Sequence, residues 1–292
     1  MIRSILVCII VHLAIAVFAD AEFIVIDVSG GTDANEYPVT KLEKSPEGGW
    51  DEEYKTDKIV LKRIEIPEIT FCIGVFEVTQ RQWELVTGKR PSYYNNEECY
   101  RVRPVDNVSY DDIRGKAKGA EYPKSSDVDE LSFLGLLRMK ARLPTLDLPT
   151  RRQWEAACRD SGGAEDCDNP LVIARRARLG VNCGYYLVPP AAWRGCGVDN
   201  GTAKAGMYEP NGHGLYDMCG NVCEWCLDAC DETDETVVRL GCTWEEFRPF
   251  GKLRVLKGGH CESSAPFCKS TIVYGENSSF TSRSIGLRLA CK

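Results

Sequence analysis

Histidine is scarce in this 292-residue chain, which contains only His12, His213 and His260. An iron centre built from imidazole groups needs several histidines to converge, so we expect no histidine-ligated iron centre. Basic residues are also in deficit, because 36 Lys and Arg face 43 Asp and Glu, for a formal net charge of -7. A nucleic-acid-binding surface needs clustered Lys and Arg, so we expect no nucleic-acid partner.

Long apolar runs are lacking beyond the N-terminus. An apolar stretch from Ile5 to Phe18 follows the basic Arg3 and precedes the small-x-small sequence Ala19-Asp20-Ala21. This pattern predicts a secretory signal peptide over residues 1–21. The apolar core is short for a membrane span of about 20 residues. We therefore expect a secreted or periplasmic protein with no membrane span in the mature chain.

Cysteine, by contrast, is abundant. The sequence has 15 cysteines, and removal of Cys8 with the signal peptide leaves 15 minus 1, or 14. An even number in an exported chain predicts disulfide bonds. We expect bridges among Cys167, Cys183 and Cys196 to hold an irregular region over residues 160–210.

A tight group of four cysteines follows, at positions 219, 223, 226 and 230. The spacing could indicate a four-thiolate zinc site. Export to an oxidising compartment favours disulfides instead, with Cys242 or Cys261 as candidate partners.

Residues 22–57 mix short apolar pieces with Gly, Pro and charged residues, which predicts a loosely packed N-terminal strand and linker. Residues 58–292 then form one domain without an internal repeat. Alternating apolar residues predict strands over 59–66 and 71–75. The basic run 175–178 is interpreted as a solvated helix face.

Three short helices have recognisable starts. Thr79 is a good N-cap for a helix that ends at Gly88, and Ser109 begins a second helix with acidic residues in its first turn. Thr150 and Gln153 have capping-box spacing for a third. Short helices, brief strands and extensive loops describe an α+β domain with low regular content.

Six collinear segments carry a family resemblance: Glu77-Val78-Thr79 with Gln82-Trp83, Pro104-Val105 with Val108-Ser109-Tyr110, Leu148-Pro149-Thr150 with Gln153-Trp154-Glu155, Asn211 to Trp225, Arg254 to Gly259, and Ile285 to Leu289. In this order they resemble the sulfatase-modifying-factor family, the formylglycine-generating enzymes. The resemblance covers about residues 58 to 291. It implies a variant of the C-type lectin-like fold.

The segment from Asp217 to Glu224 is the metal candidate. Two carboxylates bracket a Gly-Asn turn, and a hard cation such as calcium prefers oxygen ligands of this kind. The resemblance implies a structural calcium ion held by Asp217, the carbonyl groups of Gly220 and Val222, and Glu224. The alternative is that both acids hydrogen-bond loop amides without metal.

The family's oxidase chemistry uses two cysteines, spaced Cys-x-x-x-x-Cys after the Gly-Gly of the late motif, to bind copper(I). Counted from Gly258-Gly259, Cys268 occupies the second position and Ser263 the first. A neutral hydroxyl is a poor ligand for a soft ion. Cys261, with His260 as a third ligand, is the candidate replacement. The arginine expected soon after the second cysteine is missing, with Thr271-Ile272-Val273 in its place.

Two functions therefore remain open. We favour a non-catalytic binding or accessory protein for a peptide, protein or glycan ligand, with a sulfatase as one candidate partner. The alternative is an active formylglycine-generating oxidase that uses Cys268 and a displaced Cys261. A Ser-His-Asp hydrolase built on Ser263 or Ser264 and His260 has compositional support only.

The binding alternative has its own sequence features. Residues 262–284 are rich in Ser, Asn, Thr and Tyr, a composition that suits an adaptable binding surface. This stretch resembles the variable tract of exported proteins diversified by retroelements, which share the same scaffold. The candidates to line a ligand groove are the aromatic residues Tyr93, Tyr94, Tyr185, Tyr186 and Trp193.

Overall fold

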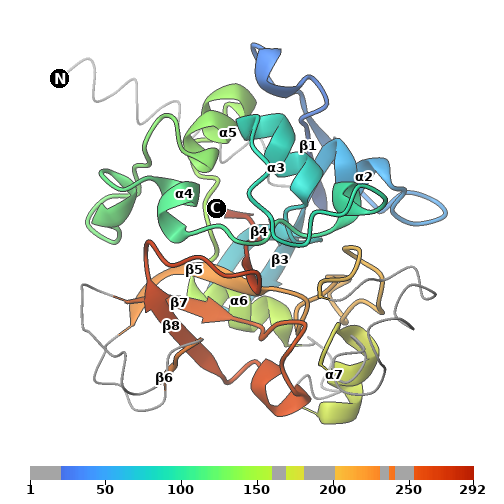
Figure 1. The fold of residues 1–292 in the computed structure, drawn as a ribbon. Helices are drawn as coiled ribbons and strands as arrows, with labels where there is room; N and C mark the ends of the chain where they lie inside the picture. Colours follow the sequence, from blue (N-terminus) through green and yellow to red (C-terminus); the bar gives the residue numbers. More distant parts are fainter. Residues whose placement is uncertain (1–20, 160–168, 181–200, 231–236, 241–252) are drawn as a thin grey trace.

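Two five-stranded sheets organise the molecule. The computed structural model describes residues 21–159, 169–180, 201–230, 237–240 and 253–292. Strand order is β10-β4-β3-β1-β2 in the first sheet and β6-β8-β7-β5-β9 in the second, whose strands β5, β7 and β8 lie side by side in Figure 1. Residues 1–20 of the predicted signal peptide and Cys167, Cys183, Cys196 and Cys242 fall outside the described residues.

The strands are brief, as the sequence predicts. They are β1 Phe23–Asp27, β2 Val39–Leu42, β3 Lys58–Ile66, β4 Ile69–Gly74, β5 Cys223–Cys230, β6 Val237–Val238, β7 Leu253–Lys257, β8 Val273–Asn277, β9 Ile285–Gly286 and β10 Ala290–Cys291. The two strands predicted from alternation are confirmed as β3 and β4, which form an antiparallel hairpin with Ile66 opposite Ile69. Glu68 makes the turn with a φ of 80°.

The N-terminal segment is a correction to the sequence interpretation. Strand β1 is not loosely packed, because it pairs with β2 on one side and β3 on the other. Phe23, Ile24, Val25 and Ile26 are all buried. A strand covered on both faces shows no apolar-polar alternation. The sequence of β1 therefore lacks the period-two pattern that predicts β3.

The helices are short. They are α2 Glu53–Thr56, α3 Gln80–Thr87, α4 Tyr110–Arg114, α5 Phe133–Ala141, α6 Arg151–Cys158 and α7 Pro170–Arg176, with 3-10 turns at Gly31–Asp33, Tyr100–Val102, Gly119–Glu121 and Ala265–Cys268. The predicted caps are confirmed, because Thr79, Ser109 and Thr150 each form a capping box. Gly88 ends α3 in the left-handed conformation at φ 71°.

Helix α7 corrects two further expectations. It is regular structure inside the region 160–210 that was expected to be irregular, and Asn169 caps it with Pro170 in the first turn. The basic run is not a solvated face throughout, because Arg178 is buried and its Nε donates to the carbonyl of Gly201 at 3.0 Å. Since α7 ends at Arg176 and Ala177 is extended, the chain turns Arg178 inward.

The C-terminal residues connect the two sheets. Strand β9 pairs in parallel with β5 in the second sheet, and β10 pairs antiparallel with β4 in the first. Two clusters of buried apolar side chains fill the interior, one including Trp83, Trp225 and Leu287 and the other including Phe71 and Trp154. No helix within the described ranges is long and apolar enough to cross a membrane.

Candidate functional site

A double-glycine turn leads from β7 into the loop that carries Ser263 and Cys268, called here the oxidase loop. Gly258 and Gly259 have φ values of 95° and 69°, a region that glycine enters without steric cost. A Cβ atom on Gly259 would lie 2.4 Å from Cys268 Sγ. Glycine at this position therefore lets the Cys268 thiol lie directly against the backbone.

Ser263 and Cys268, the two positions counted from the glycine pair, lie together. The Ser263 hydroxyl hydrogen-bonds the Cys268 thiol. A reciprocal turn holds the serine, because Ser263 N donates to the His260 carbonyl at 2.8 Å and His260 N donates to Ser263 Oγ at 3.2 Å. Burial raises the pKa of Cys268 to about 12, although hydrogen bonds from His260 and Ser263 oppose the rise. The thiol is therefore neutral at physiological pH.

Cys261 faces different neighbours from Cys268. Its backbone N donates to the Asn221 carbonyl at 2.9 Å, and its thiol interacts electrostatically with Tyr94. Cys268 instead interacts electrostatically with Cys223 and Tyr274, and this interaction raises the pKa of both groups. These neighbours of Cys261 and of Cys268 thus differ.

His260 is uncharged in this environment. Burial lowers its pKa to about 4, more than the neighbouring Glu262 carboxylate raises it. Its Nδ1 accepts a hydrogen bond from Glu262 N at 3.3 Å, while Ser263 Oγ is bonded to the backbone N of His260 rather than to the ring. This geometry lacks the serine–imidazole hydrogen bond on which a hydrolytic triad depends.

A cavity of about 390 Å³ opens over this loop. Ser263, Ser264, His260 and Phe267 form part of its wall, and Arg239 and Glu262 supply charges. Its polar and apolar lining is typical of a site that binds a small ligand or a peptide side chain. The polar stretch 262–284, predicted as a binding surface, supplies half of the residues that line the cavity.

An aromatic and charged cluster adjoins the cavity at Glu262. Tyr94 OH donates to Glu262 Oε1 at 3.2 Å, and Arg283 forms an ion pair with the same oxygen at 2.8 Å. The Arg283 guanidinium lies 5.6 Å from the centre of the Tyr93 ring. Tyr93 is 62% exposed, whereas Tyr94 is half-buried. Tyr185, Tyr186 and Trp193 lie outside the described residues.

The predicted metal segment contains a buried ion pair. Glu224 is 1% exposed and accepts hydrogen bonds from Arg288 Nε at 3.0 Å, Arg288 NH2 at 2.8 Å and Trp154 Nε1 at 2.6 Å. Arg288 also donates to the carbonyls of Gly74 and Tyr216. Both Glu224 oxygens are therefore engaged by protein donors.

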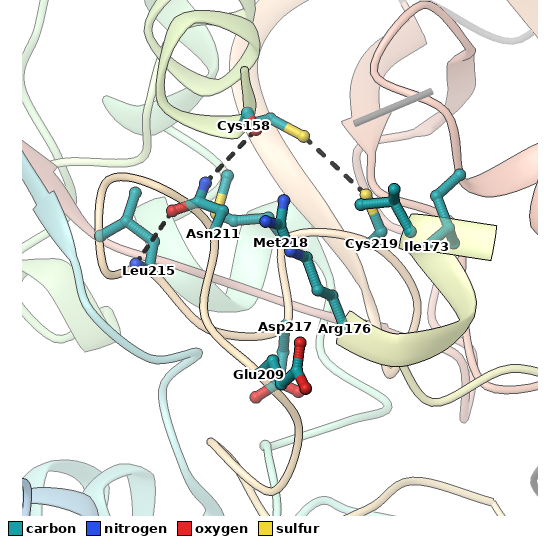
Figure 2. Close-up of a pocket in the computed structure, with 10 residues that line it drawn as sticks. Cys158, Ile173, Arg176, Glu209, Asn211, Leu215, Asp217, Met218 and Cys219 are labelled. Carbon is teal, nitrogen blue, oxygen red and sulfur yellow. Dashed lines mark hydrogen bonds between the residues drawn. The ribbon is translucent and has the colours of Figure 1, made fainter. Parts of the chain in front are cut away.

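Asp217 has a different environment. Its Oδ2 accepts from Gly206 N at 2.6 Å, while its buried Oδ1 has no hydrogen-bond partner. Burial raises the pKa of Asp217 to about 6. Figure 2 shows its side chain in a small pocket beside Glu209 and Arg176. An unpartnered buried carboxylate oxygen suits a cation, so Asp217 fits the predicted calcium site and Glu224 fits it less well.

The turn between these acids is fixed by close packing. Gly220 has a φ of 88°, and a Cβ there would lie 2.4 Å from the Arg178 carbonyl. Gly220 N donates to the Gly258 carbonyl at 2.6 Å, which joins the metal segment to the double-glycine turn. Side chains of His, Cys, Asp and Glu do not gather in threes as a metal site anywhere in the described ranges, and the cysteines at 219, 223, 226 and 230 form no zinc centre there.

Glu77 is a site residue that sequence reasoning missed. Its carboxylate accepts from Asn221 Nδ2 at 2.6 Å and Val222 N at 3.2 Å, so it holds the metal segment from the other side. Burial and the charges of Asp217 and Glu224 raise its pKa well above the ordinary value. Glu77 and Arg288 both lie inside the motifs that carry the family resemblance. A buried charged side chain needs a partner of opposite charge or a set of hydrogen bonds. The charged residues within these motifs could therefore have been predicted to contact one another.

Comparisons with known proteins agree with this architecture. The family profile described as "Sulfatase-modifying factor enzyme 1-like domain" matches residues 26–292. The chain belongs to this family. It is 29% identical over 210 residues to "Chaperone protein LppX" of Paenibacillus barcinonensis, covering 64% of this chain and 73% of that protein.

A second relative is the "Formylglycine-generating enzyme" of Thermomonospora curvata. Identity is 33% over 129 residues, which is 41% of this chain and 40% of the relative, so the match spans less than half of that enzyme. Among solved structures, "Treponema denticola variable protein 1" has the same fold, with a TM-score of 0.54 and 22% identity over 80% of this chain and 95% of the other. The α+β, formylglycine-generating-enzyme-type fold predicted from sequence is confirmed.

Proposed function

We propose that this protein is a binding or accessory member of its family that does not carry out the copper-dependent oxidation. The observation that carries the proposal is the hydroxyl of Ser263 against the Cys268 thiol, where the oxidase chemistry needs a second thiol. The residues present do not fit copper(I), because a neutral hydroxyl and a neutral buried thiol replace a pair of soft thiolates. The backbone N of Cys261 is bonded to the Asn221 carbonyl, so its thiol would take the place of Ser263 only if the loop shifted.

The cavity over Ser263 supports a ligand-binding role. It combines the apolar Phe267 with Arg239 and Glu262, which suits an extended polypeptide segment. The relative called a chaperone supports the same class of ligand, and the relatives called formylglycine-generating enzymes make a sulfatase one candidate partner. We place the protein outside the cytoplasm because of the predicted signal peptide.

The proposal is tested with purified protein, copper(I), oxygen and a peptide that carries a Cys-x-Pro-x-Arg motif. We expect no aldehyde at the peptide cysteine by mass spectrometry, in conditions where the Thermomonospora enzyme converts the same peptide. Conversion that disappears in Cys268→Ala would overturn the proposal and establish the oxidase.

We also propose that a structural calcium ion binds at Asp217, with the carbonyl groups of Gly220 and Val222 as further ligands. Calcium at about 100 times its dissociation constant should stabilise the folded state by about 2.7 kcal/mol, which corresponds to a rise in Tm of roughly 5–10 °C. Glu224 can contribute only if it releases one of its protein donors.

The calcium proposal is tested by thermal melting with calcium and with a chelator. Asp217→Asn should remove the calcium-dependent rise, and asparagine tolerates the φ of 55° at this position. Asp33→Asn, the same change at an exposed acid far along the chain, should keep the full rise. An equal response to calcium in wild type and Asp217→Asn would rule out this site.

A further inference from the structure

Two pairs of cysteines lie close together away from the oxidase loop. Cys72 on β4 is directly opposite Cys291 on β10 in the antiparallel register. Opposed residues in such a ladder have Cα atoms about 4.5–5.5 Å apart, inside the range of about 4.4–6.8 Å found in disulfides. Their side chains lie on the same face of the sheet, and the two thiols hydrogen-bond each other.

The second pair joins a helix to the metal segment. Cys158 is the last residue of α6, and Cys219 follows Asp217 by two positions. Their Sγ atoms are 3.9 Å apart, and Figure 2 shows the two side chains pointing toward each other. Both side chains are buried, so only a small movement separates this contact from a covalent bond of about 2.05 Å.

We propose that Cys72–Cys291 and Cys158–Cys219 form disulfide bonds. In each, two thiols lose two protons and two electrons as the S–S bond forms. A disulfide oxidant, such as glutathione disulfide, accepts the electrons and protons and is reduced to two thiols.

Both bonds would fix the same buried centre. Cys219 precedes Glu224 by five positions, and Cys291 follows Arg288 by three. One bridge fastens the segment that carries Glu224 to α6, and the other fastens the segment that carries Arg288 to β4. The Glu224–Arg288 ion pair would thus be held from both sides, whereas Cys268 would keep its thiol. Neither pair includes Cys268, so both bonds are compatible with either function.

Peptide mapping tests the pairing directly. The protein is produced in the periplasm of a bacterial host, denatured, alkylated without reduction, digested and analysed by mass spectrometry. We expect linked peptides containing Cys72 with Cys291 and Cys158 with Cys219, and alkylated Cys268. Alkylated cysteines in either pair, or links from them to other cysteines, would overturn the assignment of that pair.

Variants give an independent readout. Cys72→Ala/Cys291→Ala and Cys158→Ala/Cys219→Ala should each lower Tm by about 5–10 °C more than Cys226→Ala, a matched change at a buried cysteine outside both pairs. A loss equal to that of Cys226→Ala would contradict a bond. If a double variant fails to fold, Cys291→Ala alone should make Cys72 newly alkylatable, and its continued resistance would overturn the pair.

Discussion

Ser263→Cys is expected to create a copper(I) site that the wild-type protein lacks. The new thiol would lie where the serine hydroxyl now hydrogen-bonds Cys268, so two soft ligands would face each other. We expect binding of one copper(I) per chain and an affinity at least about 100-fold above wild type, a difference of about 2.8 kcal/mol. Competition with a copper(I) chelator measures the change.

Two controls make this test specific. Ser264→Cys adds the same thiol one residue later, at an exposed position, and should leave copper affinity near wild type. Cys268→Ala in the Ser263→Cys background should abolish the gain. Wild-type affinity equal to that of Ser263→Cys would contradict the expectation and would indicate that Cys223, which acts electrostatically on Cys268, already completes a thiol pair.

Arg288→Met is expected to destabilise the protein by about 3–5 kcal/mol, because Glu224 would remain buried without its cation. Arg288 is fully buried, and it donates hydrogen bonds to Glu224 and to the carbonyls of Gly74 and Tyr216. Glu77 also loses a neighbouring positive charge in this variant. Urea denaturation gives the free energy of unfolding for the comparison.

The matched variant is Arg152→Met, which removes a surface ion pair to Glu68 in which both side chains are exposed. It should cost no more than about 1 kcal/mol. Arg288→Lys keeps the charge without the guanidinium fork and should recover part of the loss if Arg288→Met does not fold. A cost below about 1 kcal/mol for Arg288→Met would show that the ion pair does not hold this centre.

Local signals in the sequence predicted local structure well. The caps at Thr79, Ser109 and Thr150 were predictable because each involves a side chain and a backbone amide three residues away. Ser263 and Cys268 were singled out by counting from the glycine pair, by resemblance to the family.

Long-range partners were less predictable. Glu224 and Arg288 are separated by 64 positions. No local sequence pattern therefore predicts that Glu224, expected as a calcium ligand, instead forms an ion pair with an arginine. The hydrogen bond from Cys261 N to the Asn221 carbonyl likewise depends on packing between distant segments. Strand β1 was misjudged because its two faces pack into two different apolar clusters, whose other members include Leu289 and Trp154, far along the chain.

The pairing of β9 with β5 and of β10 with β4 has a consequence for how the protein is made. Ala290 pairs with Ile73, so the first sheet gains its edge strand only after residues more than two hundred positions apart have met. Contacts of such wide separation close slowly. A nascent chain therefore reaches its native topology only after residue 291 has been synthesised.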